Sequence, residues 1–595
     1  MFDQQDRKND IKFRAKVIFE IILALSTISV INLYRLQISN ADKYLLMSNK
    51  NRIRLAPIVP RRGRIVTADG EIVATNICQY KLVMERSDAK TFRENMKIIR
   101  QCLTISEEDA ASLNEARRKK YPFIIVKDRL SWEEYSKLSM VLFKLNGVSI
   151  TNTYSRNYPV GPEFAHIAGY ASGSSRDASI YNGKSGIEHY ANEQLRGKFG
   201  NIQTEVNATG KRVKIIDSLE PTVGEDIILT IDSRLQKYVY DTLSLERAGA
   251  AVVLDLSSGE VLAMVSIPSF DPNLFSQGMT KTQWQEVTGN PMFPLINRAV
   301  NCSYPPGSIF KIVVAFAALC EGIISPKDRI YCSGGIKLED RVFHCWNRAG
   351  HGYMNLTDAL RFSCDCYFFE ISRRLGIDRI VGYAEKLGLG SETGLELPTE
   401  NSGLLPTRRW KFLHYGTTWK PYETMLAGIG QGALLATPLQ LATMLGKIYA
   451  GNTDFSPTLI KNQRKNKKFD IKNTLDSRHL TIIKDALRQV CTSGTAARSC
   501  NTDYGISGKT GSSQVKKIKS HEVGMSQSRI PWKWRDHALF VGCAPVPNSR
   551  YVVAVFVEHG GGGASVAAPI ARKIFDWLLL TTPPEKKSQR QDANE

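Results

Sequence analysis

The sequence predicts an α/β protein that is attached to a membrane by one N-terminal helix. Three features indicate this: a long apolar run near the N-terminus, a β-rich stretch after it, and a C-terminal part in which apolar strands alternate with buried helices. Hydrophobic residues make up 43% and charged residues 23% of the 595 positions. That balance is typical of globular proteins and excludes a wholly disordered or collagen-like chain.

The membrane anchor is predicted at residues 17–36. Its apolar run, Val17–Leu33, would span roughly 25 Å as a helix, so flanking residues must help it to cross the hydrocarbon core. Five basic residues precede the run within the first 16 positions, which predicts a cytoplasmic N-terminus. A cleaved signal peptide and a buried soluble helix are the alternatives, although no small-x-small cleavage site follows the run.

Composition divides the rest of the chain into four regions. They are a cytoplasmic tail at 1–16, a region of short strands and polar helices at 37–243, an α/β domain at 244–580, and a polar tail at 581–595. The boundary near 243 lies where an amphipathic helix ends and a new apolar strand begins at Ala248. Near the end, HALFVGCAPV and RYVVAVFVEH predict two strands, followed by a helix at Ser565–Leu580. The basic segment 461–472 predicts a solvated loop.

The chain is strongly basic. Lys and Arg number 79 and Asp and Glu 58, which gives a net charge of +21 and a pI near 9.4. An anionic partner is therefore expected, such as an acidic membrane surface or a phosphorylated substrate. Nucleic acid is not expected, because no zinc-finger, RNP or helix-turn-helix signature accompanies the charge. The eleven cysteines are an odd number, so at least one stays unpaired.

Ser308 and Lys311 are the first candidate catalytic pair. In YPPGSIFKIVVAFAALCEG the Pro-Pro-Gly turn predicts a buried helix that begins at Ser308, which places Lys311 one turn later on the same face. A hydroxyl at a helix N-terminus beside an amine is suited to attack an acyl group, because the dipole and the ammonium stabilise the developing anion. An N-cap next to a surface lysine is the alternative, since Ser-x-x-Lys also occurs by chance.

Two downstream segments extend this pair to a pattern. Ser363–Asp365 (Ser-Cys-Asp) begins 55 residues after Ser308, and Lys509–Ser512 (Lys-Thr-Gly-Ser) begins 146 residues after Ser363. Ser-x-x-Lys, Ser-Asp-Asn and Lys-Thr-Gly form the signature of class A β-lactamases and penicillin-binding proteins. These separations leave room for a helical lobe inserted between sheet segments. A second Lys-Ser-Gly at Lys184–Gly186 precedes the serine motif and fails the test of order.

The chain resembles the class B, monofunctional penicillin-binding proteins, which are peptidoglycan D,D-transpeptidases. In the first part the resemblance depends on PRRGRIVTADG, RNYPVGPEFAHIAGY, GIEHYANEQLRG and ILTIDSRLQ. In the second it depends on LDLSSGEVLAMVSIPSFDPN, NRAVNCSYPPGSIFK, GIGQGALLATPLQLA and GKTGSSQ. Asp365, where many relatives carry Asn, and the opening NRIRLAPIVPRRG are most similar to the elongation type, penicillin-binding protein 2. The septal type is the nearest alternative.

The resemblance implies a fold for both large regions. Residues 244–580 would form a transpeptidase domain of the penicillin-binding and β-lactamase type, with a five-stranded antiparallel sheet flanked by helices and an all-helical lobe. Residues 37–243 would form a β-rich pedestal or dimerisation domain.

The resemblance also implies roles for the site residues. Ser308 would attack the penultimate D-Ala carbonyl of a stem peptide and release the terminal D-Ala, and an amine of a neighbouring strand would resolve the acyl-enzyme. Lys311 would be the base, and Ser363 would pass the proton to the leaving amine. Asp365 would orient the hydroxyl group of Ser363. Lys509 and Thr510 would bind the carboxylate of the substrate or of a β-lactam, and Gly511 would admit the substrate backbone. The backbone N–H groups of Ser308 and Ser512 would form the oxyanion hole.

A candidate metal site consists of Cys332, Cys345, His351 and Cys364. Three thiolates and an imidazole are a normal tetrahedral zinc set, although intervals of 13, 6 and 13 residues match no standard finger. A disulfide such as Cys332 with Cys345 is the alternative in an oxidising compartment. The resemblance favours a structural zinc, because some elongation-type relatives carry one at matching positions. Cys366 and His344 are less favoured ligands, and the chemistry itself requires no cofactor.

The resemblance implies an enzyme of the bacterial inner membrane with its catalytic domain in the periplasm. No second catalytic domain fits in 37–243, so glycan polymerisation needs a partner. The implied partner is a RodA-like SEDS glycosyltransferase, with MreC as a further contact. Three rivals share the motifs: a serine β-lactamase, a D,D-carboxypeptidase, and a penicillin-binding sensor or scaffold without turnover.

Overall fold

The computed structural model describes residues 3–42, 53–85, 88–105, 107–118, 123–173, 181–206, 212–461, 471–516 and 525–581. Most of the predicted loop at 461–472 and nearly all of the polar tail at 581–595 lie outside these residues. The chain divides into two compact units. The first unit consists of residues 1–61 and 197–224, and the second of residues 62–196 and 225–595.

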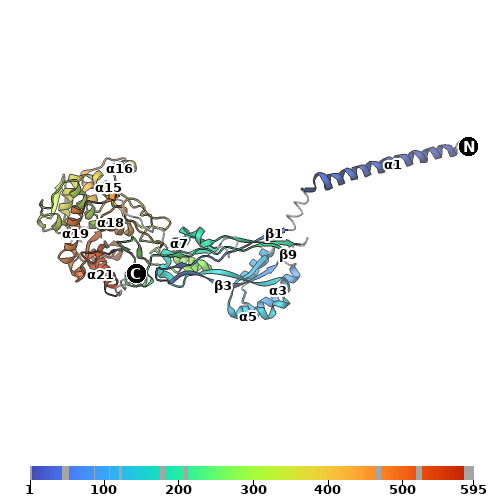
Figure 1. Cartoon of the computed structure of the whole chain (residues 1–595), viewed down its shortest axis with the longest axis horizontal. Helices are drawn as coiled ribbons and strands as arrows, with labels where there is room; N and C mark the ends of the chain where they lie inside the picture. The colour runs from blue at the N-terminus through green and yellow to red at the C-terminus, as the bar shows by residue number, and fades with distance from the viewer. Residues whose placement is uncertain are drawn as a thin grey trace, which may run out of the picture. The chain divides into compact units, whose positions relative to one another are not determined.

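The first unit begins with one long helix, α1 (Asp3–Tyr34), which a short π-helical turn at Arg35–Ser39 continues (Figure 1). Residues 11–39 are long and apolar enough to cross a membrane. Thr27 and Ser29 donate their hydroxyl groups to the carbonyls of Leu23 and Leu25, at 2.8 and 2.9 Å. Because these polar groups are satisfied within the helix, they are compatible with a lipid environment.

A three-stranded antiparallel sheet completes the first unit. Its order is β1 (Ile53–Ile58), β8 (Gly200–Val206) and β9 (Arg212–Leu219), and Ile53 lies opposite Glu205. Pro57 lies on β1, which is an edge strand, where the missing N–H of proline is tolerated. This sheet joins segments that are about 145 residues apart in the chain, and no local pattern predicts such a pairing.

The N-terminal part of the second unit is built on a long strand, β3 (Ile72–Glu85), as the sequence leads one to expect of a β-rich region. β3 pairs with β4 (Phe123–Leu130) and β5 (Val148–Asn157), and apolar helix faces cover the sheet (Figure 1). The helices are α3 (Ala89–Cys102), α4 (Glu107–Arg118) and α5 (Trp132–Val141). Smaller elements are β2 (Ile65–Val66), β10 (Ile227–Ile228), β6 (Ala171–Gly173), β7 (Tyr181–Gly183), α6 (Ala165–Ala168), α7 (Gly186–Tyr190) and α8 (Asn192–Arg196).

A buried ion cluster holds this part together. Glu188 on α7 is fully buried and accepts from the Nε atoms of Arg62 and Arg156, each at 2.6 Å. Burial alone would raise the pKa of Glu188, but the charges of Arg156 and Arg62 outweigh burial and hold that pKa below its ordinary value. We call these three residues the pedestal cluster. It ties the motifs PRRG, RNYP and GIEHY to one point.

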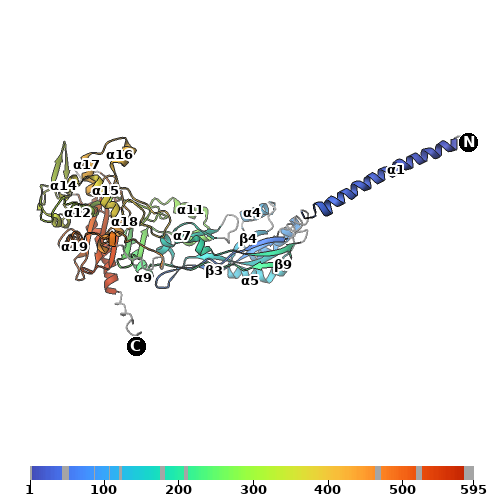
Figure 2. The same ribbon diagram turned by 45° about the horizontal axis from the view of Figure 1, so that its top comes forward.

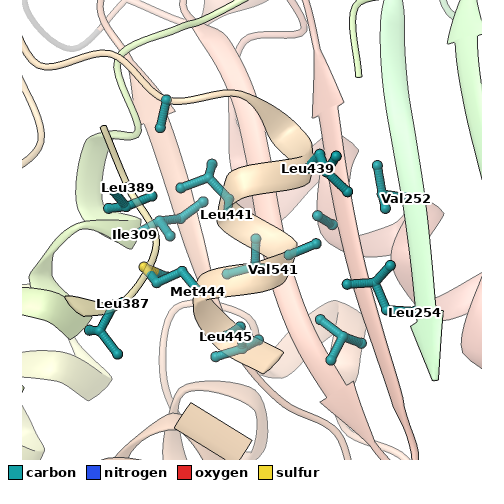
Figure 3. Packing of buried hydrophobic residues seen from close by; sticks show 14 of the residues in the cluster. Val252, Leu254, Ile309, Leu387, Leu389, Leu439, Leu441, Met444, Leu445 and Val541 are labelled. Atoms are coloured by element: carbon teal, nitrogen blue, oxygen red, sulfur yellow. The ribbon is translucent and has the colours of Figure 1, made fainter. Parts of the chain in front are cut away.

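The C-terminal part of the second unit contains a five-stranded antiparallel sheet, which confirms the predicted fold class. Its order is β12 (Val261–Ile267), β11 (Gly249–Asp255), β19 (Tyr551–Val557), β18 (His537–Ala544) and β17 (Ser507–Ser513). The strands are almost continuously buried because helices cover both faces. On one face, Leu439 and Leu445 of α18 (Pro438–Ala450) pack towards Val252 and Val541 (Figure 3).

Helices α9 (Ser233–Leu243) and α21 (Ala568–Asp576) cover the other face. Short π-helical turns flank α21 at Gly563–Ala567 and Trp577–Thr581, which agrees with the predicted terminal helix. Between β12 and β17 lies a mostly helical lobe (Figure 2). Its helices are α12 (Lys311–Cys320), α13 (Leu356–Arg361), α14 (Asp365–Leu375), α15 (Ile377–Lys386), α16 (Arg408–Tyr415), α17 (Pro421–Gly428), α18, α19 (Ser477–Thr492) and α20 (Ala497–Cys500), and α10 (Pro272–Gln277) and α11 (Lys281–Thr288) precede them.

The lobe also carries two short strand pairs that the sequence analysis does not anticipate. β13 (Ile330–Cys332) pairs with β16 (Gly352–Met354), and β14 (Gly335–Leu338) pairs with β15 (Arg341–His344). These strands are only three or four residues long, so they lack the alternation by which longer strands are recognised.

Candidate active site

Ser308 and Lys311 lie at the start of the buried helix, as predicted, with one difference. The helix does not begin directly at Ser308. Instead, a 3-10 turn at Gly307–Ile309 carries the half-buried Ser308, and α12 begins at Lys311. Gly307 has a φ of +54°, and a Cβ added there would lie 2.6 Å from the carbonyl oxygen of Ser512. Only glycine allows this approach, which brings the serine turn against β17.

Lys311 is fully buried and donates to three acceptors on one segment. Its Nζ lies 2.9 Å from the carbonyl oxygen of Ser363, 3.2 Å from Ser363 Oγ and 2.7 Å from Asp365 Oδ1. An ammonium has three N–H bonds, and all three are used here. Ser363 and Asp365 of the second motif therefore contact Lys311 of the first motif directly.

Lys509 approaches the same hydroxyl from β17. Its Nζ lies 3.0 Å from Ser363 Oγ and 3.2 Å from the carbonyl oxygen of Thr510, and its side chain is fully buried. Burial and the positive charge of Lys311 lower the pKa of Lys509 well below its ordinary value. Among the residues that the structure describes, no carboxylate lies within ion-pair distance of Lys509. Lys509 is thus a buried amine without a bound counter-charge.

The backbone around Ser363 is specialised. Ser363 links α13 to α14 with a φ of +56°, which a residue other than glycine rarely adopts. Asp365 is the first residue of α14, and its Oδ2 accepts from the backbone N–H of Trp346 at 2.8 Å. The Trp346 indole donates to the carbonyl oxygen of Ser363 at 3.1 Å. Sequence reasoning misses Trp346, because a lone tryptophan in a loop carries no recognisable signal.

The remaining predicted residues lie along β17. Thr510 and Gly511 are buried, whereas Ser512 is exposed. Gln431, from the GIGQG motif, donates to the carbonyl oxygen of Ser512 at 3.3 Å, and Gly307 N–H donates to the carbonyl oxygen of Gly430 at 3.0 Å. The serine turn, the GIGQG loop and β17 therefore meet. The excluded Lys184–Gly186 lies elsewhere, at the start of α7, where Lys184 N–H donates to the carbonyl oxygen of Tyr170.

The four predicted zinc ligands converge beside this site. One potential ligand atom from each of Cys332, Cys345, His351 and Cys364 lies within 4.8 Å of the others. His351 Nδ1 is 3.6 Å from the sulfur of Cys332 and 3.5 Å from that of Cys345. A tetrahedral zinc with ordinary bond lengths places sulfur and nitrogen roughly 3.5 Å apart, so the donor set fits the metal. The structure places no disulfide between any of the eleven cysteines, all of which lie in the described residues.

Both large regions of the chain are similar to domains of known proteins. The model of the penicillin-binding protein transpeptidase domain matches residues 249–576, and that of the penicillin-binding protein dimerisation domain matches residues 57–229. The peptidoglycan D,D-transpeptidase MrdA of Salmonella typhimurium is 32% identical over 609 residues, with 96% of this chain and 97% of that protein covered. MrdA of Escherichia coli is 32% identical over 597 residues, with 95% and 94% covered.

Solved structures that are similar to this chain are also penicillin-binding proteins. The penicillin-binding protein PBP2 of Helicobacter pylori, in a complex with MreC, has a TM-score of 0.78 and 28% identity and covers 88% of this chain and 99% of that chain. PBP2 of Pseudomonas aeruginosa, in complex with WCK 5153, has a TM-score of 0.67 and 30% identity and covers 91% and 100%. The resemblance to the elongation type is thereby confirmed, and the chain belongs to the penicillin-binding protein transpeptidase family, with MrdA and PBP2 among its relatives.

Proposed function

We propose that this protein is the peptidoglycan D,D-transpeptidase that cross-links stem peptides during cell elongation, and that β-lactams acylate it at Ser308. One observation carries the proposal: the hydroxyl of Ser363 lies within 3.2 Å of two buried lysines that come from segments far apart in the chain. Buried amines without enough counter-charge are costly to maintain, and such arrangements concentrate at catalytic sites. The MrdA relatives, which are named as peptidoglycan D,D-transpeptidases, support the same activity.

The reaction starts at Ser308. Its Oγ bonds to the penultimate D-Ala carbonyl carbon while Lys311 takes the hydroxyl proton. The tetrahedral intermediate then breaks the amide bond, a proton reaches the leaving nitrogen through Ser363, and D-Ala departs. In the second half, an acceptor amine attacks the ester, transfers its proton back and restores Ser308. The backbone N–H groups of Ser308 and Ser512 stabilise the oxyanion in both halves.

Lys311 must give up a proton before it can act as the base, and Ser363 offers a path. A substrate carboxylate that binds at Lys509 and Thr510 supplies the counter-charge that Lys509 lacks, and this favours the ammonium form of Lys509. Ser363 then passes its hydroxyl proton to Lys509 and receives one from Lys311. Lys311 becomes a neutral amine at the moment when substrate is present. Asp365 holds Lys311 at the correct position for this exchange.

The test uses the full-length protein in detergent with a pentapeptide that ends in D-Ala-D-Ala and a D-amino acid as the acceptor amine. Mass spectrometry should show release of D-Ala and a product that carries the acceptor, and Ser308→Ala should abolish both. Ser185→Ala is the matched control, because Ser185 belongs to the Lys-Ser-Gly that lies outside the site. Exchange that persists in Ser308→Ala contradicts the proposal, as does hydrolysis without exchange.

We further propose that Cys332, Cys345, His351 and Cys364 hold one structural zinc ion. Zinc would cross-link the end of β13, the residue after β15, the residue before β16 and the start of α14. It would so fix the loop that carries Trp346 and the segment Ser363–Asp365. Elemental analysis of freshly reduced protein should find about one zinc per chain. Cys345→Ser should lose it and lower the Tm, whereas the exposed Cys78→Ser should keep it. Metal-free wild-type protein with an unchanged Tm contradicts the assignment.

Membrane attachment and partners complete the proposal. Residues 17–36 anchor the chain in the inner membrane, with residues 1–16 in the cytoplasm, and 37–243 and 244–580 form the pedestal and the periplasmic transpeptidase domain. A RodA-like polymerase and MreC are the proposed partners in the elongation machinery. They are supported by a PBP2 solved with MreC and by a relative solved in a peptidoglycan synthase complex. Pull-down with the full chain should retain both partners, and an exchanged anchor helix should weaken retention of the polymerase.

A further inference from the structure

Thr495, which none of the three motifs contains, touches the proposed carboxylate-binding residue. Its Oγ1 lies 2.9 Å from Oγ1 of Thr510 on β17. Thr510 is buried, with 8% of its surface exposed, whereas Thr495 is half-buried. The two hydroxyls form a pair in which either oxygen could be the donor.

The backbone holds Thr495 in place through the segment that carries Ser363. Thr495 N–H donates to the carbonyl oxygen of Arg361 at 3.2 Å, and Arg361 Nε donates to the carbonyl oxygen of Ser493 at 3.3 Å. A Cβ on Gly494 would lie 2.4 Å from the same Arg361 oxygen, so glycine is needed for this approach. Arg361 ends α13, two residues before Ser363. Thr495 therefore connects the Ser363 segment to β17.

The numbers of donors and acceptors determine the direction of the hydrogen bond between the two threonines once a carboxylate is bound. A hydroxyl has one proton to donate, and a carboxylate can only accept. If the Thr510 hydroxyl donated its hydrogen bond to Thr495, the lone pairs of the Thr510 oxygen would face the negative carboxylate. If Thr495 donates instead, the proton of Thr510 is free for the ligand. The branched Cβ of Thr495 restricts its χ1 and keeps its hydroxyl in position.

We propose that Thr495 is a positioning residue that donates to Thr510 and so orients the Thr510 hydroxyl towards the carboxylate of the substrate or of a β-lactam. The inference rests on the proposed function, because it requires a carboxylate at Thr510. It predicts an effect on ligand binding rather than on bond breaking, and only for ligands that carry the carboxylate.

The experiment measures acylation of the full-length protein in detergent by benzylpenicillin and by its methyl ester, with the binding constant and the acylation rate constant resolved separately. Thr495→Val preserves shape and removes the donor. It should lower the second-order rate constant for benzylpenicillin about 3- to 10-fold, the size expected for one hydrogen bond, through weaker binding. Thr495→Ser should recover most of the loss. The methyl ester should react with Thr495→Val and with wild type at equal rates.

Two controls separate a positioning role from a structural one. Thr492→Val changes an exposed threonine at the end of α19 and should react like wild type. In a Thr510→Val background, Thr495→Val should have no further effect, because both changes break one interaction. Equal rates for Thr495→Val and wild type with benzylpenicillin overturn the inference, and so does an equal loss with the ester. Failure of wild type to react at all would instead overturn the proposed function.

Discussion

Two buried clusters in the second unit contain the same kinds of ionisable group, two basic side chains and one carboxylate, but differ in chemistry. The pedestal cluster combines Arg62 and Arg156 with Glu188, and the active site combines Lys311 and Lys509 with Asp365. Each therefore places two potential cations beside one carboxylate. In the pedestal cluster both cations contact the carboxylate, whereas in the active site only Lys311 does.

The difference shows why the two clusters use different basic residues. Arginine keeps its charge at every accessible pH, so the pedestal cluster is a fixed ionic link. A buried lysine can release its proton, so in the proposed mechanism a proton can move between the two lysines when a ligand arrives. The second lysine bonds to a hydroxyl instead of a carboxylate, as the proposed binding of a substrate carboxylate at Lys509 requires. Four substitutions test this difference between the clusters.

Lys311→Arg should keep a positive charge at position 311 but remove the amine that can release and accept a proton. Acylation by benzylpenicillin should fall about 10²- to 10⁴-fold, the usual contribution of general base catalysis. Stopped-flow acylation measures the rate, and the Tm verifies that the variant is folded. A folded variant that reacts within tenfold of wild type would show that Lys311 need not lose its proton.

Glu188→Gln should destabilise the pedestal cluster without touching the chemistry. Two buried guanidinium groups would lose their counter-charge, which costs about 3–5 kcal/mol. Urea unfolding measures the loss, and acylation per folded molecule should not change. Glu193→Gln is the matched control, because Glu193 forms an exposed pair with Arg196 at 2.8 Å and should cost less than about 1 kcal/mol. Equal costs for the two variants would contradict the account.

Lys509→Met should change how stability depends on pH. The pKa of Lys509 is lowered in the folded protein, so below about pH 10.4 the Lys509 amine binds a proton in the unfolded protein but not in the folded one. As the pH falls, the free energy of unfolding of wild type should therefore decrease relative to that of Lys509→Met. The difference should grow by up to about 1.4 kcal/mol per pH unit and level off once folded Lys509 is protonated. Urea unfolding of both proteins between pH 10.5 and 7.5 tests this. A constant difference would mean that the pKa of Lys509 is not lowered.

Asp365→Asn should have the smallest effect on stability. Asp365 contacts one buried cation, whereas Glu188 contacts two, so we expect a smaller cost of about 1–2 kcal/mol. Calorimetry beside Glu188→Gln makes the comparison direct. A cost as large as that of Glu188→Gln would mean that both clusters behave as fixed ion pairs.

The proposed catalytic residues could be identified in the sequence because their motifs are local and follow one another in a recognisable order. Ser308, Lys311, Ser363 and Lys509 each stand in a short pattern whose chemistry is readable. The four candidate zinc ligands follow from their residue types and from the family resemblance, and the structure brings them together. The short strands β13 to β16 around them carry no signal in the sequence.

The parts that escaped prediction depend on long-range contacts. Arg62, Arg156 and Glu188 lie in the quoted motifs, but nothing local states that they meet in one buried cluster. Thr495 and Trp346 form hydrogen bonds to residues 15 and 19 positions away, Thr510 and Asp365, and such contacts leave no periodicity in the sequence. The 3-10 turn at Ser308 is set by the close approach of Gly307 to β17, which is also invisible locally.

The most direct test is intact mass spectrometry of the full-length protein after incubation with benzylpenicillin, followed by peptide mapping. We expect one long-lived adduct per chain on Ser308, absent from Ser308→Ala and slow to form in Lys311→Arg. An adduct on another residue, rapid hydrolysis of the drug, or no adduct on folded wild-type protein would contradict it.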